Sequence, residues 1–205
     1  MKKSLVSDIN LKHEIESTKN DNDEITVFLS KTLSGCIYLV IDCSASMRGE
    51  KLSSVKEGTK NFALNAKAKS YLIGLIKFSS EATLVAETQT DLINIYHKID
   101  ELDTNGTTNM ADAIIMASEK LERQNGARIM IIATDGMPND EEAALKAATQ
   151  AKKNEIEIIA LGTDDADEKF LKQIASSSSF GVKVSRNLIG KAIATTAKML
   201  KRPGG

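Results

Sequence analysis

With 205 residues, the chain is long enough to bury one sizeable hydrophobic core, and two full domains would be unusual at this length. Its hydrophobic content of 41% and charged content of 27% are those of an ordinary globular protein, and no apolar run approaches the roughly 18 residues that a membrane-spanning helix needs. A formal net charge of -1, with no basic stripe in either half, argues against nucleic acid or an anionic membrane as the partner.

The first 34 residues are polar and irregular, and we expect them to form an extension that precedes the folded domain. Residues 1–6 carry two lysines, but no continuous apolar segment follows. They therefore do not resemble a signal peptide, and a cytoplasmic location is expected. Residues 19–24 have the composition of a turn or loop. Residues 25–29 are a candidate edge strand beside the main sheet.

From residue 36 onward, strand-like and helix-like segments alternate, which favours a mostly parallel sheet with helices on both faces. The first of them, 36–41, is short, apolar and rich in β-branched residues, as is typical of a strand buried on both faces. Strands are expected at 36–41, 71–78, 83–87, 128–134, 155–161 and 181–184, and helices at 49–67, 90–102, 109–124, 139–153, 166–176 and 187–201.

Local signals support several of these boundaries. Residues 73–78 and 83–85 are two strand-like runs joined by a few small polar residues, which predicts a hairpin and hence one antiparallel strand at an edge of the sheet. Pro138 and the acidic residues after it, beginning with Asp140, are typical of a helix start. Asn125 and Gly126 are typical of a helix end.

These elements predict an α/β protein with a Rossmann-like, doubly wound sheet. The sheet is expected to have six mostly parallel strands, one antiparallel edge strand and helices on both faces. We expect this domain to occupy residues 35–201, followed by a flexible C-terminal tail at 202–205.

The two cysteines, Cys36 and Cys43, lie on or beside the first predicted strand. If that strand is extended, they are separated by about 23 Å, which is far beyond disulfide reach, and they point to opposite faces. We interpret both as small apolar residues that fill space in or near the core. A redox-sensing role for Cys43 is the alternative.

Directly after strand 36–41, a carboxylate and two hydroxyls occur at alternate positions: Asp42, Ser44 and Ser46. In an open α/β sheet this carboxyl end of the strands is where ligands bind. Three oxygen donors without a thiolate or imidazole suit a hard divalent cation, Mg²⁺ or Mn²⁺, better than Zn²⁺. Because these donors cannot saturate such an ion, further ligands must come from elsewhere in the chain.

Two later segments can supply the missing oxygens. Residues 105–113 precede a helical pattern and contain Thr108, and the buried-strand pattern 129–134 is followed by Asp135. Taken singly, each donor also has a simpler role. The serines are typical of turns or caps, Thr108 of a cap for helix 109–124, and Asp135 of an Asx turn. Thr107 competes with Thr108 for the ligand role.

The three motifs Asp-x-Ser-x-Ser, Gly-x-Thr-Asn and Thr-Asp-Gly occur here in that order. Together they closely resemble the von Willebrand factor A domain and its metal-ion-dependent adhesion site, over roughly residues 35–199. The family has Gly-Gly-Thr-Asn where this chain has Gly106-Thr107-Thr108-Asn109, which favours Thr108 as the ligand. The resemblance implies a cation held by the following five residues: Asp42, Ser44, Ser46, Thr108 and Asp135.

The same resemblance implies how such a site would work. An acidic side chain of a partner protein replaces a water on the metal, and a shift of Thr108 is coupled to displacement of the last helix, 187–201. Asp103, Asp164 and Asp165 are further carboxylates that we expect to remain outside the ligand set. The sequence is therefore interpreted as a metal-dependent protein-protein interaction module.

An enzyme is the less favoured interpretation. The chain has no Gly-x-Ser-x-Gly, Walker-type or His-Glu-x-x-His motif. A Mg²⁺-dependent phosphohydrolase of the haloacid-dehalogenase type would need a second carboxylate two residues after Asp42, where Ser44 stands. The size and the missing export signal resemble stand-alone bacterial members of tellurium-resistance and phosphorylation-linked systems, which implies kinases, phosphatases or AAA+ ATPases as partners. Extracellular adhesion is the alternative.

Overall fold

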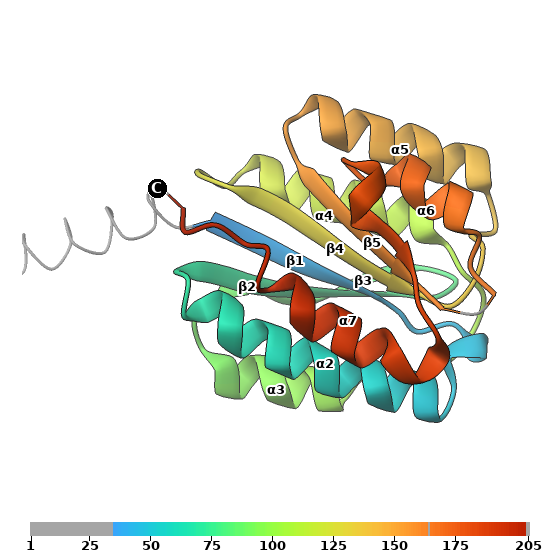
Figure 1. The fold of residues 1–205 in the computed structure, drawn as a ribbon, viewed down its shortest axis with the longest axis horizontal. Helices are drawn as coiled ribbons and strands as arrows, with labels where there is room; N and C mark the ends of the chain where they lie inside the picture. The colour runs from blue at the N-terminus through green and yellow to red at the C-terminus, as the bar shows by residue number, and fades with distance from the viewer. Residues whose placement is uncertain (1–34, 164, 204–205) are drawn as a thin grey trace, which may run out of the picture. The chain divides into compact units, whose positions relative to one another are not determined.

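The computed structural model describes residues 35–163 and 165–203, which form a six-stranded sheet between two layers of helices (Figure 1). The candidate strand at 25–29 lies outside these residues. Neighbouring strands run parallel except for the β2–β3 pair at one edge, as the hairpin signal predicted. In spatial order the strands are β3 (Ala82–Gln89), β2 (Tyr71–Phe78), β1 (Gly35–Asp42), β4 (Arg128–Thr134), β5 (Glu157–Gly162) and β6 (Gly181–Lys183).

β1 lies near the middle of the sheet, and all eight of its residues are buried. Because side chains alternate along a strand, Ile37 and Leu39 face one helical layer while Cys36 and Tyr38 face the other. A strand that contacts core on both faces needs an unbroken apolar run, and this is why its sequence shows no polar alternation. The two free cysteines lie in opposite core clusters, as predicted, with Cys43 in the cluster of Ile37.

Helices cover both faces of the sheet, which confirms the predicted doubly wound arrangement (Figure 1). One face is covered by α2 (Glu50–Lys67), α3 (Leu92–Asp100) and α7 (Ile189–Thr196), and the other by α4 (Met110–Glu122), α5 (Glu141–Lys153) and α6 (Glu168–Ile174). Three short 3-10 helices complete the described elements: η1 (Ala45–Met47), η2 (Ser178–Phe180) and η3 (Arg186–Leu188). None of the helices in the described residues is both long and apolar enough to span a bilayer.

α5 starts near the predicted position and ends at Lys153 as predicted, but the strand after it begins later than predicted. Asp140 is the N-cap, and its side chain accepts a hydrogen bond from Ala143 N. After α5 the chain does not pass directly into a strand at 155, because Glu155 has a left-handed backbone with φ +59°. The amides of Glu155 and Ile156 bond back to the carbonyls of Lys152 and Ala151, a Schellman ending usually made with glycine. The predicted strand 155–161 therefore begins only at 157.

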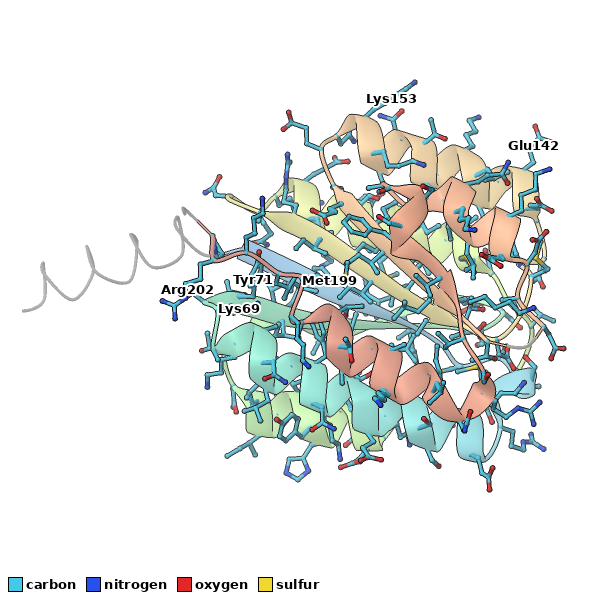
Figure 2. All side chains as sticks on the ribbon, in the orientation of Figure 1. Lys69, Tyr71, Glu142, Lys153, Met199 and Arg202 are labelled. Carbon is cyan, nitrogen blue, oxygen red and sulfur yellow. The ribbon has the colours of Figure 1, made fainter. Side chains whose placement is uncertain are left out.

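The last helix is shorter than the predicted 187–201. α7 spans Ile189–Thr196, with η3 before it and a turn at 197–199 after it. Two backbone carbonyls after this helix accept hydrogen bonds from side chains near the start of β2. Lys69 Nζ donates to Leu200 O at 2.6 Å, and the Tyr71 hydroxyl donates to Lys201 O at 2.9 Å. These contacts hold the C-terminal segment against the start of β2, where Lys69, Tyr71 and Met199 lie close together (Figure 2).

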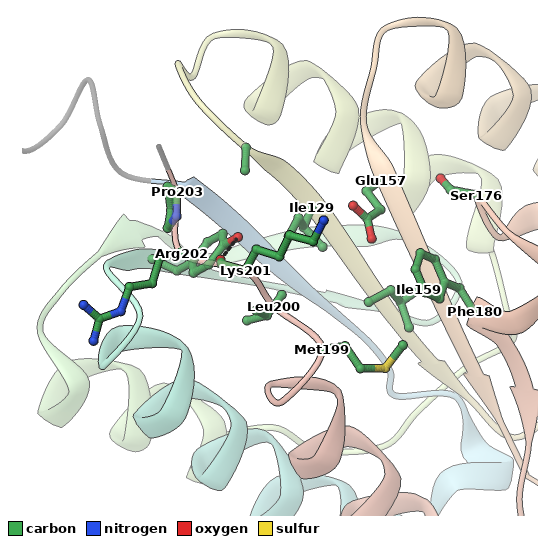
Figure 3. Close-up of a pocket in the computed structure, with 12 residues that line it drawn as sticks. Ile129, Glu157, Ile159, Ser176, Phe180, Met199, Leu200, Lys201, Arg202 and Pro203 are labelled. Atoms are coloured by element: carbon green, nitrogen blue, oxygen red, sulfur yellow. Dashed lines mark hydrogen bonds between the residues drawn. The ribbon is translucent and has the colours of Figure 1, made fainter. Parts of the chain in front are cut away.

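A groove of about 630 Å³ opens beside this segment (Figure 3). Its walls include Ile129 and Glu157 at the amino ends of β4 and β5, together with Met199 and Lys201. It therefore lies at the opposite end of the strands from the candidate metal ligands.

Candidate metal centre

The predicted ligands are carried by three loops at the carboxyl edge of the sheet. Asp42 ends β1, and the two serines follow it on and beside η1. Asp135 follows β4, the parallel neighbour of β1, with Ile41 opposite Ala133. From β1 the chain continues to β2 on one side, and from β4 to β5 on the other. The ligands thus gather at the topological switch point of the sheet, where open α/β proteins bind ligands.

Asp42 is completely buried, and only neutral groups of the described residues contact its carboxylate. Ser44 N donates to Oδ1 at 2.8 Å, and Thr134 Oγ1 donates to Oδ2 at 2.6 Å. Burial raises the pKa of Asp42, while the hydrogen bonds from Thr134 and Ser44 lower it. A buried carboxylate without a cationic partner is costly, so this position is chemically suited to a bound cation.

The two serine hydroxyls connect Asp42 to Asp135. Ser44 Oγ and Ser46 Oγ are 2.9 Å apart, and Ser46 Oγ donates to Asp135 Oδ1 at 2.8 Å. Ser44 is buried, whereas Ser46 is exposed, so this row of oxygens reaches from the core to solvent. Four of the five predicted ligands are therefore brought together in one hydrogen-bonded row, which is buried at Asp42 and Asp135 and exposed at Ser46.

Thr108 lies in the neighbouring loop and is not hydrogen bonded to the other four. That loop is attached to the serine loop by two backbone bonds, Ala45 N to Gly106 O at 3.1 Å and Asn105 N to Cys43 O at 2.9 Å. Gly106 has φ +66°, and a Cβ there would lie 2.3 Å from Ser80 Oγ, so the turn before Thr108 requires glycine. The loop is thus positioned beside the oxygen row by its backbone.

The structure distinguishes Thr108 from its competitors. The Thr107 hydroxyl already contacts Ser80 Oγ at 3.3 Å and accepts from Asn139 Nδ2 at 2.9 Å. The cap of α4 is Asn109, whose side chain accepts from Asp112 N, so the alternative that Thr108 caps this helix is wrong. Of the two threonine hydroxyls in this loop, the Thr107 hydroxyl is hydrogen bonded, whereas the Thr108 hydroxyl makes no hydrogen bond to the described residues. Thr108 is therefore the threonine available as a ligand.

Two contributors to the site were missed by the sequence analysis. Thr134 donates to Asp42, and Lys51 Nζ forms an ion pair with Asp135 Oδ2. The Lys51 and Asp135 side chains are only 8% and 0% exposed, so this pair is buried. Thr134 could have been found from its place in the Thr-Asp-Gly motif. Lys51 is harder to identify from the sequence. It lies about one helical turn after the serines, and a lysine in such a place is ordinarily expected to be exposed to solvent.

The other acidic residues at this edge have different roles. Asp103 pairs with Lys77 at 3.3 Å, and Asp140 caps α5. Asp165 has a 73% exposed side chain and lies 3.8 Å from Lys51 Nζ. Asp164 lies outside the described residues. Within the described chain no group of three or more His, Cys, Asp or Glu side chains could hold a metal, so a cation at this edge depends on the hydroxyl donors.

An open parallel sheet with carboxylate and hydroxyl oxygens at its switch point defines a Rossmann-like domain equipped for a hard cation. Residues 37–193 match the family model of the von Willebrand factor type A domain, and the chain belongs to that family.

Similar curated proteins include matrilin-1 and heavy chains of the inter-alpha-trypsin inhibitor. Matrilin-1 of Gallus gallus is 27% identical over 162 residues, which cover 72% of this chain and 32% of matrilin-1. The chain spans a third or less of the length of the curated relatives that it matches.

Two solved structures share the fold. The vWF domain of the type V pili tip protein Mfa5 from Porphyromonas gingivalis has a TM-score of 0.74 at 14% identity, covering 82% of this chain and 95% of that one. Proximal thread matrix protein 1 from the mussel byssus, with a zinc-occupied MIDAS motif, has a TM-score of 0.68 at 18% identity. That match covers 80% of this chain and 46% of the mussel chain.

Proposed function

We propose that this domain is a metal-dependent protein-protein interaction module. In it, Mg²⁺ or Mn²⁺ binds at the carboxyl edge of the sheet, and an acidic side chain of a partner protein completes the coordination. The observation that carries the proposal is the row of oxygens from buried Asp42 through Ser44 and Ser46 to buried Asp135, with Ser46 exposed to solvent. The proposed ligands are Asp42, Ser44, Ser46, Thr108 and Asp135, with the hydroxyls binding directly and one or both carboxylates acting through water.

The chemistry of these donors supports a hard cation that stays reactive toward an acidic ligand. Hydroxyl oxygens are neutral, so they bind the ion without cancelling its charge, and Mg²⁺ in proteins usually keeps several waters. A partner's carboxylate can replace one of those waters. The mussel structure supports a divalent ion in this family, and its zinc makes Zn²⁺ an ion to test beside Mg²⁺ and Mn²⁺.

The first test is metal binding by isothermal titration calorimetry with MgCl₂, MnCl₂ and ZnCl₂. We expect saturable binding to the wild type, tighter for Mn²⁺ than for Mg²⁺ as for most oxygen and nitrogen sites, and none to Asp42→Ala. Thr108→Ala should weaken binding about tenfold or more, which corresponds to the loss of one ligand contact of roughly 1.4 kcal/mol. Thr107→Ala is the matched control, because its hydroxyl already contacts Ser80 and Asn139.

Partner capture is the second readout. Immobilised wild-type protein should retain its partner from native lysate in Mn²⁺, release it on chelation and recapture it when the metal is restored. Asp42→Ala should capture nothing, whereas Asp140→Ala, which loses a helix cap at the same edge, should behave as the wild type. Capture that survives the chelator would contradict the proposal.

We further propose that the module is not an enzyme and that its partners are intracellular kinases, phosphatases or AAA+ ATPases. Ser44 stands where a phosphohydrolase of the haloacid-dehalogenase type needs an acid, which supports the first point. Turnover of a phosphoester that requires Mg²⁺ and is lost in Asp42→Ala would contradict it. Extracellular adhesion is the second candidate, favoured by the similarity to a pilus tip protein, and fractionation of the source cells distinguishes the two locations.

A further inference from the structure

The buried charges of the described residues meet at one place. Asp42, Lys51 and Asp135 are the three charged side chains that are buried there, and each lies at the carboxyl edge of the sheet. The first and the last are proposed metal ligands, but Lys51 cannot bind a metal while it carries a proton. A buried ammonium group beside a cation site is electrostatically unfavourable for the cation, so its presence there calls for an explanation.

Lys51 is also in an unfavourable place within its own helix. It lies in the first turn of α2, where the helix dipole repels positive charge. Gly49 precedes the helix with φ +81°, and side chains in a helix lean toward its N-terminus, so Lys51 reaches back toward the serine loop. Burial and the dipole both oppose a lysine here. The buried ion pair with Asp135 compensates them, together with a longer contact to the exposed carboxylate of Asp165.

The two carboxylate oxygens of Asp135 contact two different residues. Oδ1 accepts a hydrogen bond from Ser46 Oγ, and Oδ2 is paired with Lys51 Nζ. An oxygen held by an ammonium group has little electron density left for a metal. Asp135 is thus arranged to support the Ser46 hydroxyl, while the second oxygen is kept from the ion by Lys51.

The charge balance shows what this arrangement does. Among the three buried side chains, Asp42 and Asp135 contribute two negative charges and Lys51 one positive charge, so their net charge is -1 without a divalent ion and +1 with it. Asp165 lies 3.8 Å from Lys51 Nζ, but its side chain is 73% exposed, so solvent screens its charge. Without Lys51 the same values would be -2 and 0. The lysine therefore weakens attraction for the cation and leaves the loaded centre positive, which favours an incoming carboxylate.

We propose that Lys51 is a positioning residue of the metal centre, which holds Asp135 outside direct coordination and keeps the loaded site positive for an acidic ligand. The inference rests on the proposed metal-binding function. Lys51 limits the number of protein carboxylates that bind the ion directly. The position left by Asp135 is taken by water, which a partner's carboxylate can replace.

The test compares Lys51→Met with wild type using Mn²⁺ alone. We expect Lys51→Met to unfold at a lower temperature without metal, because Asp135 is left buried and unpaired, and to bind Mn²⁺ about tenfold more tightly, because a like charge is removed. The metal-induced rise in melting temperature should therefore be larger in the variant than in wild type. A merely structural ion pair would leave the metal-induced rise unchanged.

Two further variants separate charge from shape. Lys51→Arg retains the positive charge and should bind Mn²⁺ nearly as the wild type does, whereas Lys51→Gln removes only the charge and should resemble Lys51→Met. Lys60→Met is the matched control, because Lys60 lies on the same helix and its pair with Asp100 is partly exposed. If Lys51→Met folds only when Mn²⁺ is present, that result also supports the proposal.

Bound water gives an independent readout. Broadening of the Mn²⁺ electron paramagnetic resonance signal by ¹⁷O-water should show fewer bound waters in Lys51→Met than in wild type, because Asp135 becomes free to coordinate. Equal Mn²⁺ affinity and equal hydration in the two proteins would overturn the role of Lys51 and leave the proposed function standing. Failure of the wild type to bind Mn²⁺ would overturn both.

Discussion

At the scale of single residues, Asp42 and Asp135 are both buried but are stabilised differently. Asp135 has a lysine of the same chain as its counterion, whereas Asp42 has only hydrogen bonds from Ser44 and Thr134 among the described residues. Asp42 is therefore the carboxylate that most needs an external cation. Its charge is retained at a cost to the stability of the metal-free protein, as is common for residues that serve a site rather than the fold.

This difference predicts the effect of Asp42→Asn. The substitution keeps the side-chain volume and removes the buried charge, so we expect the metal-free protein to gain about 1 kcal/mol in free energy of unfolding while losing metal binding. Urea denaturation in the presence of a chelator measures the gain. Asp140→Asn is the control, since Asn replaces Asp equally well at an exposed cap. A less stable Asp42→Asn protein would show that the carboxylate supports the fold.

Single residues also show where prediction from sequence ends. The five proposed ligand positions were chosen from local motifs, because each donor is adjacent to a strand end or a loop that the sequence identifies, and their role as ligands stays a prediction. Lys51 was not found in this way, because its burial depends on Asp135, which is 84 positions away in the chain. A side chain that becomes buried only through such a distant contact has no local signature.

At the scale of elements, the strands were predicted more accurately than the ends of the helices. β1, β2 and β4 consist of apolar runs that start and stop sharply, so their bounds could be read within about two residues. The start of β5 was missed because Glu155 adopts a conformation usually left to glycine, and the end of α7 because Lys69 and Tyr71 bind its following carbonyls. Both boundaries are set by backbone geometry or tertiary contacts.

α7 is held against α2 by a direct contact between helix backbones. A Cβ added at Gly58 would lie 2.2 Å from Gly190 O, and one added at Gly190 would lie 2.2 Å from Ser54 O. Gly190 N also donates to Ser54 Oγ at 3.3 Å. Displacement of this helix, which the resemblance to the family implies, stays a prediction. Any such motion would have to separate this close contact.

The glycine contact predicts the effect of Gly190→Ala. The added methyl group meets rigid backbone rather than a movable side chain, so α7 must shift, and we expect a loss of about 1–3 kcal/mol in free energy of unfolding. Gly136→Ala is the control, because a Cβ there meets nothing within 4 Å and the backbone is not in the left-handed region. Both variants are compared with wild type by urea denaturation. A loss no larger than that of Gly136→Ala would mean that α7 is easily displaced.

At the scale of the whole molecule, the proposed ligands are distributed over loops that come together only when the sheet is formed. β1 and β4 are adjacent in the sheet although α2, β2, β3, α3 and α4 separate them in sequence. The unfolded chain therefore has no comparable site, and a cation that binds the proposed ligands would bind the native state alone. The core clusters on both faces of the sheet are made of apolar side chains and do not include the metal ligands.

This separation of site and core predicts how the metal changes unfolding. Mn²⁺ at about one hundred times its Kd should raise the free energy of unfolding by about 2.7 kcal/mol, because it binds only the folded chain. The slope of that free energy against urea should stay the same, since the surface exposed on unfolding is already set by the two apolar layers. Urea titrations with Mn²⁺ and with chelator measure both quantities, and Asp42→Ala should show no shift in midpoint. A steeper slope with metal would mean that the cation orders part of the fold, and the site would then be a structural centre rather than a binding surface on a finished domain.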